Sequence, residues 1–355
     1  MARVLVLGGT SYVAQFLLQR LLQSESLRVA DGDVLGDISA VACTMRSQPF
    51  SPLPNGFVTE SDSAAQSTRT VRVYWQVDIL DLGALGNCIK EFHPTVVINC
   101  TAISSPALCQ KDSKKAHAIN EPRELVTLLD HLPWRIRFVH LSTDFVYDGR
   151  QPWGEGYDED AAVLSSELSV YGADKLRFDQ HLMEQSSANL QVLILRIANV
   201  VGPAAPLFPD RSAPKFMEWL HHQLFQSGTA TVPLKLWRDE FRSYLYIQDF
   251  VAILFKMLSA QAETPATLVN VGGVEALSRV ELAHKYLGAC TRHNSKAVNA
   301  VKREIVPTAR AQVDLGYPSP LNTKLSTARL AHLLPTFART STDQFLDEIS
   351  HSFLA

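Results

Sequence analysis

Three residues near the middle of the chain have the types and spacing needed for proton transfer at a carbonyl group. Tyr171 and Lys175 are four residues apart in the run YGADK, and positions i and i+4 share one face of a helix. A neighbouring ammonium lowers the pKa of a phenol, so Tyr171 would protonate a carbonyl oxygen while a hydride reaches the carbon. Thr143, which ends the run LST, would donate a hydrogen bond to the same oxygen. Two alternatives stay open: YxxxK also arises by chance, and the hydroxyls of Ser142 and Thr143 also suit capping of the next turn.

The first residues of the chain have the order of a dinucleotide-binding turn. An apolar run at 3–7 is followed by GGTSYVA, where Gly8 permits a tight turn and a helix would begin. The start of a helix offers unpaired amides and a partial positive charge to a pyrophosphate. Ser11 and Ala14 stand where the fingerprint has glycine, and a plain strand-to-helix connection is the alternative. We expect contact with the cofactor, including contact of the Ser11 hydroxyl with phosphate, from Gly8, Thr10, Ser11, Tyr12 and Val13.

Residues at the ends of three further apolar runs would complete this site. Asp78 and Ile79 follow the run at 71–77 and would border an adenine, although Asp78 would equally suit the end of a strand before a helix. The small residues Cys100, Thr101 and Ala102 would let the backbone pass close to a cofactor. Arg46 ends the run at 40–45, with no acidic residue between 40 and 50. An acidic residue there binds the ribose 2′-hydroxyl, whereas arginine suits a 2′-phosphate, so we expect NADP(H) in preference to NAD(H).

Alternating short apolar runs and helical patterns predict the elements that must position these residues. Their order predicts an α/β, Rossmann-type doubly wound parallel sheet with a smaller C-terminal substrate-binding lobe. A proline-rich crossing at 203–215 leads into that lobe, and 47–70 is predicted to be a surface loop between strands. The predicted strands are 3–7, 40–45, 71–77, 95–100, 136–142 and 191–197, and the predicted helices are 12–23, 82–92, 114–131 and 168–187.

Composition excludes several classes of partner. The 355 residues carry a formal charge of −3, which favours neither a nucleic acid nor an anionic membrane. No apolar stretch approaches the roughly 20 residues of a membrane span, and the chain starts in a strand-like run rather than a leader. Five dispersed cysteines fit a reducing compartment, so we expect a cytoplasmic protein. We predict no metal site, because the adjacent His221 and His222 point to different faces of a helix.

Motifs along almost the whole chain resemble those of a known family. They are VLVLGGTSYVA, VDILD, HPTVVINCTA, HAIN, LSTDFVYDG, VYGADK, LILRIANVVG, DEFRSYLYIQDFV, VNVGGVEALSRVELA and YPSPLNTKLSTARL. The chain resembles an extended short-chain dehydrogenase/reductase of the dTDP-4-dehydrorhamnose reductase-like group. That group also contains the regulatory beta subunit of methionine adenosyltransferase.

The resemblance implies roles for individual residues. The catalytic triad of the family falls on Thr143, Tyr171 and Lys175, and Tyr171 and Lys175 also border the cofactor. Substrate contacts fall on Asp144, Phe145, Asn199 and Arg242. Asn199 replaces a tryptophan that lies against the deoxysugar in the sugar-nucleotide reductases, and the connection between Gly149 and Tyr171 is longer and more acidic here. The implied domains are a cofactor domain at 1–202 that also receives about 241–260, a smaller lobe at 203–240 and 261–335, and a C-terminal helix at 336–355.

Two functions remain open, beside a third interpretation in which the chain keeps the fold of the family with a degraded site. The first is an NADP-dependent reductase of a keto group, on a sugar or nucleotide-sugar-like small molecule. The second is a non-catalytic, NADP-binding regulatory subunit resembling the methionine adenosyltransferase beta subunit, in complex with a larger enzyme. A homodimer is compatible with either.

Overall fold

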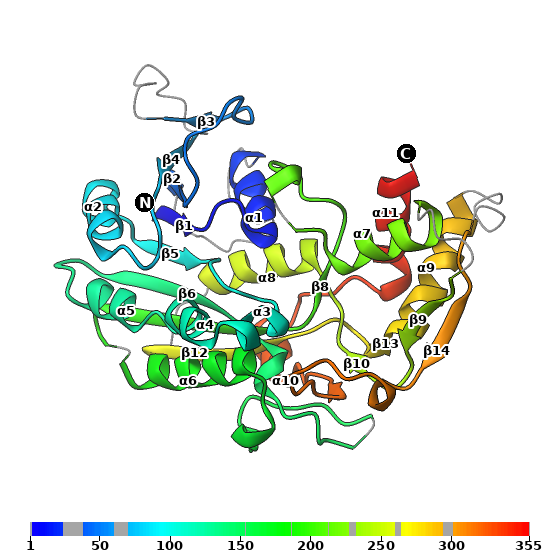
Figure 1. Cartoon of the computed structure of the whole chain (residues 1–355). Helices are drawn as coiled ribbons and strands as arrows, with labels where there is room; N and C mark the ends of the chain where they lie inside the picture. The colour runs from blue at the N-terminus through cyan, green and yellow to red at the C-terminus, as the bar shows by residue number, and fades with distance from the viewer. Residues whose placement is uncertain are drawn as a thin grey trace.

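The computed structural model describes residues 2–23, 38–59, 70–152, 154–185, 187–211, 213–226, 232–259, 264–293 and 301–354. An eight-stranded parallel sheet forms the centre of the molecule (Figure 1). Its order is β12 (Ala266–Val271), β7 (Leu190–Ile197), β6 (Ile136–Thr143), β5 (Val96–Asn99), β1 (Ala2–Leu7), β2 (Ile38–Met45), β4 (Val71–Trp75) and β3 (Phe57–Val58). The strands run outward in both directions from β1 and β5, which confirms the predicted doubly wound Rossmann-type fold.

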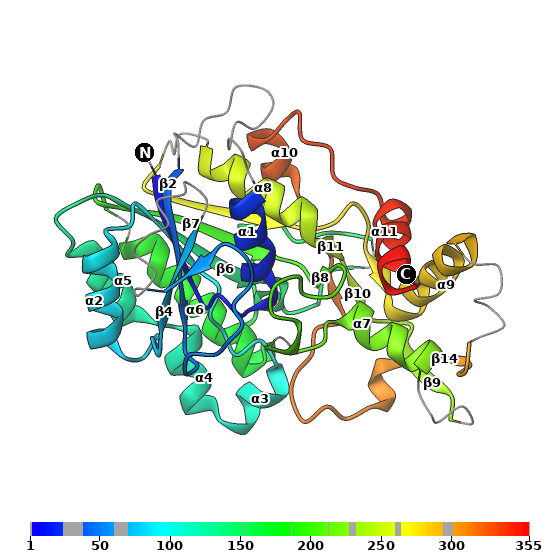
Figure 2. The same cartoon turned by 90° about the horizontal axis from the view of Figure 1, so that it is seen from above.

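Helices cover both faces of this sheet, as Figure 2 shows from above. On one face lie α1 (Tyr12–Gln23) and α8 (Ile247–Ser259), whose apolar side chains share one core cluster with β1, β2 and β7. On the other face lie α2 (Leu82–Phe92), α5 (Arg123–Asp130) and α6 (Val170–Gln185), whose apolar side chains join a second cluster. Strands buried on both faces explain why the sequence runs are continuously apolar instead of alternating.

Local signals explain where the helices begin and end. The Asp81 carboxylate accepts a hydrogen bond from the amide of Ala84 at 3.0 Å and caps α2, which ends at His93 in a left-handed conformation. The single helix predicted at 114–131 is wrong, because the chain forms α4 (Ser113–Asn120) and α5 with a break between them. Pro122 cannot continue the first helix, and it disfavours helical geometry at the residue before it. The preceding α3 (Pro106–Lys111) is an element that the sequence analysis did not predict.

A smaller group of elements lies at one end of the sheet, on the right in Figure 1. It comprises α7 (Phe216–His221), α9 (Arg279–His293), α11 (Thr342–Leu354), β9 (Leu234–Trp237) with β14 (Ile305–Thr308), and the sheet of β13 (Leu277–Ser278), β10 (Phe241–Arg242) and β15 (Asn322–Thr323). One boundary differs from expectation: β12 pairs with β7 in the main sheet, although 261–335 was assigned to the smaller lobe. The chain therefore returns to the main sheet after α8 before it completes the smaller group. The remaining short elements are β8 (Val200–Val201), β11 (Leu245–Tyr246), α10 (Ala328–Leu333), η1 (Asp144–Val146), η2 (Ser165–Glu167), η3 (Pro209–Arg211), η4 (His222–Gln226) and η6 (Arg310–Gln312).

The predicted surface loop at 47–70 contributes one edge strand, β3, and its residues 60–69 lie outside the described ranges. The rings of Phe50 and Phe57 pack against Phe208 at centroid distances of 5.7 and 5.3 Å. This loop is therefore fixed to the crossing segment that leads to the smaller group. All five cysteines are unpaired; Cys100 is half-buried and the others are buried. Among the described helices, none has the length and apolar character that crossing a bilayer requires.

Candidate active site

The predicted site residues gather at one edge of the main sheet. Gly8 follows β1, Arg46 follows β2, Cys100 follows β5, and Thr143 ends β6. These strands are neighbours, and the strand order reverses between β1 and β5. In open α/β sheets, ligands bind outside the carboxyl ends of the strands at this reversal.

The turn after β1 has the backbone geometry that a close-lying ligand needs. Gly8 adopts φ +79°, and a Cβ at this position would lie 2.9 Å from the Cγ2 of Thr101. A Cβ on Gly9 would lie 2.9 Å from the Sγ of Cys43. Both positions therefore need glycine. The first amides of α1, those of Tyr12 and Val13, have no partner within the helix and point out of its N-terminus, as an anion site requires.

Ser11 uses its side chain within the protein. Its hydroxyl oxygen accepts a hydrogen bond from the amide of Ala14 at 3.3 Å, and it lies beside the thiol of Cys100, whose pKa it lowers against the effect of burial. The serine thus caps α1 and connects it to the end of β5. One amide that a phosphate would use is already bonded, which leaves Tyr12 and Val13 as the open amides of the first turn.

The remaining predicted cofactor contacts lie along the same edge. Arg46 is exposed directly after β2, and Ile79 is buried after β4. The Asp78 carboxylate accepts a hydrogen bond from the amide of Leu80 at 3.0 Å, a local turn that fixes its orientation. Thr101 donates its hydroxyl hydrogen to the Oδ1 of Asn99 at 2.6 Å. Ala102 is exposed and Thr10 half-buried, so both are open to solvent beside the turn.

The structure brings the three residues of the predicted triad together. Thr143, at the end of β6, lies beside the phenol of Tyr171 on α6 and favours the ionised form of that phenol. Lys175 lies one helical turn further along α6 and is 2% exposed. Its Nζ donates a hydrogen bond to the carbonyl of Leu141 at 3.0 Å. This hydrogen bond connects the first half of α6 to β6, so the Tyr171 phenol and the Lys175 ammonium are held on the same side of that strand.

The pKa directions differ in part from the sequence-based expectation. Burial raises the pKa of Tyr171 well above its usual value, and only Thr143 opposes this effect among the causes that act on it. A pKa moved toward neutrality is therefore not found in the chain alone. Burial lowers the pKa of Lys175 to about 8, against the opposing effect of Asp179. The phenol is accordingly held as a proton donor, while the lysine titrates close to neutral pH.

Three of the four predicted substrate residues lie together beside the triad: Asp144 and Arg242 are buried, and Phe145 is half-buried. Asp144 is 2% exposed, and its carboxylate accepts hydrogen bonds from the hydroxyls of Thr143 at 3.2 Å and Thr323 at 2.6 Å. The guanidinium of Arg242 lies 4.0 Å from this carboxylate and 5.2 Å from the ring centroid of Phe145. Burial raises the pKa of Asp144, while Arg242 opposes that shift. No local motif marks Thr323, because its partner is 179 residues away in the chain.

Arg242 and Asn199 are both involved in contacts with the protein backbone. Arg242 donates to the carbonyls of Phe241 and Pro320 at 3.1 and 2.8 Å. Asn199, between β7 and β8, is half-buried and its carbonyl accepts from the amide of Leu245 at 3.0 Å. Arg242 thus anchors the β10 strand as well as facing the predicted substrate residues.

The long connection between Gly149 and Tyr171 is docked on the smaller group. The amide of Tyr157 donates to the carbonyl of Lys324 at 2.8 Å, and the amide of Ser326 donates to the carbonyl of Tyr157 at 2.7 Å. A cavity with a volume of about 230 Å³ lies between this connection and the small sheet. Strand alternation places Arg242 and Thr323 on one face of the small sheet and the cavity on the other. The cavity is lined by Gly154, Phe241, Val274, Glu275, Ala276, Asn322 and Lys324.

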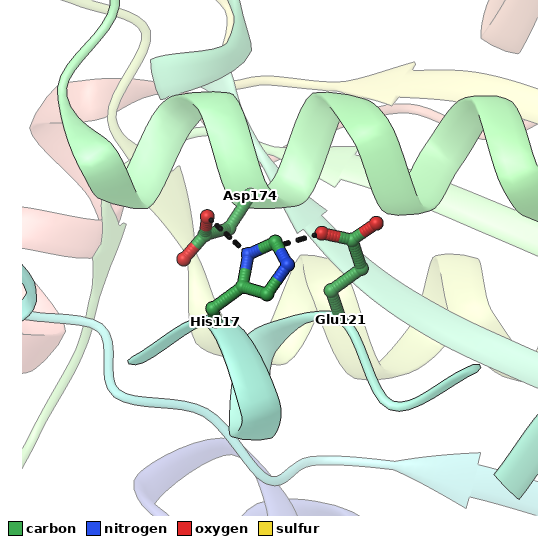
Figure 3. A group of neighbouring side chains, drawn as sticks. All are labelled: His117, Glu121 and Asp174. Atoms are coloured by element: carbon green, nitrogen blue, oxygen red, sulfur yellow. Dashed lines mark hydrogen bonds and ion pairs between the residues drawn. The ribbon is translucent and has the colours of Figure 1, made fainter. Parts of the chain in front are cut away.

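One group of potential metal ligands occurs among the described residues, and the sequence analysis did not predict it. The side chains of His117 on α4, of Glu121 directly after α4 and of Asp174 on α6 point toward one another (Figure 3). Their potential ligand atoms all lie within 4.8 Å of one another. Arg177 already supplies a cation there: its Nε donates to Glu121 at 3.2 Å, and its Nη2 bonds to Asp174. Arg123 also pairs with Glu121. The group is therefore an ion-pair cluster that fixes α4 against α6.

Comparisons with known proteins show what this chain is similar to. The model of the NAD dependent epimerase/dehydratase family matches residues 4–272. Methionine adenosyltransferase 2 subunit beta from Bos taurus is 24% identical over 258 residues, which cover 73% of this chain and 70% of that protein. The probable low-salt glycan biosynthesis reductase Agl14 from Haloferax volcanii is 31% identical over 129 residues, which cover 36% of this chain and 40% of that one.

Solved structures share the fold over nearly the whole chain. The dTDP-4-dehydrorhamnose reductase from Bacillus anthracis, in complex with NADP, has a TM-score of 0.67 at 15% identity and covers 98% of both chains. The UDP-glucose 4-epimerase from Thermus thermophilus, in complex with NAD, has a TM-score of 0.72 at 18% identity and covers 99% of both chains. The similarity thus includes the smaller group of elements as well as the main sheet.

Proposed function

The chain belongs to the NAD dependent epimerase/dehydratase family, and on this basis we propose that it is an NADP-dependent reductase of a keto group. Its similarity to dTDP-4-dehydrorhamnose reductase and to methionine adenosyltransferase beta subunits agrees with the resemblance of its motifs. The observation that carries the proposal is the placement of Tyr171 beside the residues that follow Thr143, with its ring 6.0 Å from that of Phe145, one helical turn from the buried Lys175.

The cofactor would lie along the edge of the main sheet. Its pyrophosphate would bind at Gly8 and the open amides of Tyr12 and Val13, and its adenosine would lie between Arg46 and Ile79. The exposed Arg46 suits a 2′-phosphate, which favours NADP, and the Bacillus anthracis reductase is in complex with NADP. When bound, the reduced nicotinamide supplies the hydride.

The protein residues would then handle the proton. Tyr171 donates its phenolic proton to the carbonyl oxygen, and the raised pKa keeps that proton in place until charge develops on the oxygen. Lys175, in its ammonium form, stabilises the phenolate that remains and holds the cofactor ribose. Thr143 donates a hydrogen bond to the same carbonyl oxygen and orients the substrate.

The substrate would be a sugar or a nucleotide-linked sugar. Asp144 and Phe145 border the triad, and Asn199 stands at the end of β7 on the same edge. Arg242 would face the polar part of the substrate from β10. The smaller lobe, at 203–240 and the part of 261–335 outside β12, would form the outer wall of this pocket.

Replacement of the acid tests the proposal. Tyr171→Phe is expected to lower the rate of NADPH oxidation with a panel of keto sugars and keto-sugar nucleotides by at least about 100-fold. The dissociation constant for NADPH, measured by its fluorescence, should stay the same. Tyr286→Phe is the control, because Tyr286 is buried in α9 with its hydroxyl 2.7 Å from Nδ1 of His221, away from the triad. Retained turnover in Tyr171→Phe would refute the assignment.

A second candidate function is a regulatory subunit that binds NADP without turning it over. The similarity to methionine adenosyltransferase beta subunits and the engagement of the Ser11 hydroxyl within the protein favour it. This function predicts a stable complex with the catalytic chain of a methionine adenosyltransferase in size-exclusion chromatography, and no oxidation of NADPH. Both functions require that the chain binds NADP. Titration with NADPH and NADH therefore distinguishes them from a third case, in which the site binds neither cofactor.

A further inference from the structure

Asp179 lies on the same face of α6 as the two catalytic candidates. Tyr171, Lys175 and Asp179 are spaced at i, i+4 and i+8, so their side chains follow one stripe of the helix. Asp179 is 1% exposed. A carboxylate this deeply buried needs partners, and the structure provides them on the neighbouring strands.

One oxygen of the Asp179 carboxylate has two donors. Its Oδ2 accepts from the hydroxyl of Ser142 on β6 and from the Nε of Arg196 on β7, both at 2.9 Å. Burial raises the pKa of this carboxyl, whereas Arg196 and Ser142 favour the ionised form. The ion pair with Arg196 also raises the pKa of the guanidinium.

The other oxygen has no donor. Oδ1 of Asp179 has no hydrogen-bond partner within the part of the chain that the structure describes, and the nearest ring nitrogen of the buried His140 is 3.9 Å away. Burial and the charge of Lys175 lower the pKa of His140 well below its usual value, so this ring is neutral. No donor among the described residues therefore reaches Oδ1. The next cation along the stripe is Lys175, one helical turn away and 2% exposed.

Lys175 needs a nearby negative charge to remain an ammonium. Burial alone disfavours its charged form, and the carboxylate of Asp179 acts against burial more strongly than any other group around it. The bond of Nζ to the Leu141 carbonyl accounts for one of three ammonium hydrogens. The titratable and charged groups around Lys175 are Tyr171, Asp174 and Asp179 on α6, Cys109 on α3, Cys100 after β5, His140 on β6, Asp144 on η1 and Arg196 on β7.

We propose that Asp179 is a positioning residue for the proposed reaction: its buried carboxylate, fixed by Ser142 and Arg196, holds Lys175 in the ammonium form beside Tyr171. The assignment to a reaction rests on the proposed function. The electrostatic link between Asp179 and Lys175 does not, because it follows from the packing of α6 against β6 and β7. Asp179 is proposed to act through Lys175, and its own carboxylate is bonded to Ser142 and Arg196.

The direct test is the titration of Lys175 in the cofactor-free protein. Protein labelled with ¹³C at lysine Cε gives one NMR signal for each lysine, and the signal that Lys175→Arg removes is assigned to Lys175. In Asp179→Asn the midpoint of this titration should fall by at least about one pH unit, a tenfold change in the proton affinity of the amine. Asp179→Glu should restore most of the shift, because it returns the charge.

Asp174→Asn is the matched control. Asp174 is next to Lys175 on the same helix and is similarly buried, but its carboxylate is paired with Arg177 toward α4. Its removal should shift the Lys175 midpoint by less than half as much as Asp179→Asn does. An equal or larger shift would overturn the proposal, as would an unchanged midpoint in Asp179→Asn.

A double variant covers the case in which Asp179→Asn does not fold. Asp179→Asn leaves Arg196 buried and unpaired, which is costly, so Asp179→Asn with Arg196→Gln removes both charges. The proposal predicts a lowered midpoint in this variant too, and an unchanged midpoint would overturn it.

Activity gives a second, separable readout. If the protein reduces keto substrates, the alkaline fall of kcat should move to lower pH in Asp179→Asn, with kcat at the plateau less affected. A normal alkaline limb with a lowered plateau would indicate a merely structural role and would overturn the positioning role. If NADPH is neither bound nor oxidised by the unaltered chain, the proposed function fails while the NMR titration still decides the link to Lys175.

Discussion

The side chain of His140 is fully buried on β6, between the rings of Phe138 and Phe178. Neither ring nitrogen has a hydrogen-bond partner among the described residues, and burial together with Lys175 lowers the pKa of His140 well below 6.5. A buried imidazole without partners costs free energy at any pH, and burial disfavours its protonation in the folded state. The unfolded chain can take up that proton, so the cost becomes dependent on pH.

His140→Leu should therefore make the unfolding free energy less sensitive to acid. Because the folded-state pKa is below the unfolded value, the unfolded chain gains protons as the pH falls below about 6.5. The unaltered protein should lose about 1.4 kcal/mol of unfolding free energy per pH unit below that value relative to the variant. Urea denaturation at several pH values between 5 and 7.5 measures the difference. His284→Gln, at an exposed position, is the control, and parallel curves for the protein and His140→Leu would contradict the prediction.

The residues of the triad can be predicted from the sequence, but the residues around them can be predicted only in part. Thr143, Tyr171 and Lys175 stand in local motifs whose spacing already implies a shared helix face or strand end. Asp179 continues the same i+4 spacing, and that signal could have indicated it. Thr323 could not be found in this way, because its contact with Asp144 depends on the packing of the small sheet.

Helix α6 and the short helix η1 approach each other at a glycine. A Cβ on Gly172 would lie 2.1 Å from the carbonyl oxygen of Phe145, so the two backbones could not keep this distance with any other residue. Gly172 follows Tyr171 directly, and η1 follows Thr143 directly. The contact therefore sets how closely the phenol approaches the threonine.

Gly172→Ala should consequently impair both folding and chemistry. Relief of the clash requires α6 to move away from η1, and we expect a loss of about 1–3 kcal/mol in unfolding free energy together with a fall in turnover. Gly288→Ala, within α9, is the matched control, since its nearest neighbour is the flexible end of Arg292 at 3.7 Å. The control should gain about 0.5–1 kcal/mol from helix propensity. Equal stabilities of the two variants in urea denaturation would contradict this account.

The sequence predicts helices and strands correctly where one pattern dominates, and wrongly where two local effects oppose each other. The apolar runs of β1, β5 and β7 are buried on both faces, so the sequence pattern marks them clearly. The apolar spacing across 114–131 continues through Pro122, and the backbone constraint of proline outweighs it. Strand β12 follows a helix that belongs to the main sheet, and only long-range pairing with β7 decides its place.

The main sheet and the smaller group of elements are joined by the hydrogen bond from Thr323 to Asp144. Thr323 is fully buried, and its loss would leave a buried carboxylate with one donor fewer. Thr323→Val should lower the unfolding free energy by about 1–3 kcal/mol and reduce turnover through Thr143, the other partner of Asp144. Thr308→Val is the control, because its hydroxyl bonds only to the carbonyl of Val306. Thermal and urea denaturation measure both variants, and a Thr323→Val protein as stable as the control would exclude this link.

The whole-molecule architecture was the most predictable level, because the alternation of strands and helices admits few topologies. The attachment of the two regions was not predictable. Gln15 illustrates this: its amide oxygen accepts from the backbone of Leu207 and Phe208, nearly two hundred residues along the chain. No pattern within α1 distinguishes such a glutamine from a solvent-exposed one.

Two buried cysteines can report when the elements around them separate. Burial raises the pKa of Cys43 in β2 and of Cys290 in α9, so neither thiol reacts with an alkylating reagent while its surroundings stay closed. Each becomes labelled only when the elements around it separate. Cys43 records the opening of the main sheet and Cys290 that of the smaller group. Pulsed alkylation followed by peptide mass spectrometry would thus time the two events separately, without any added probe.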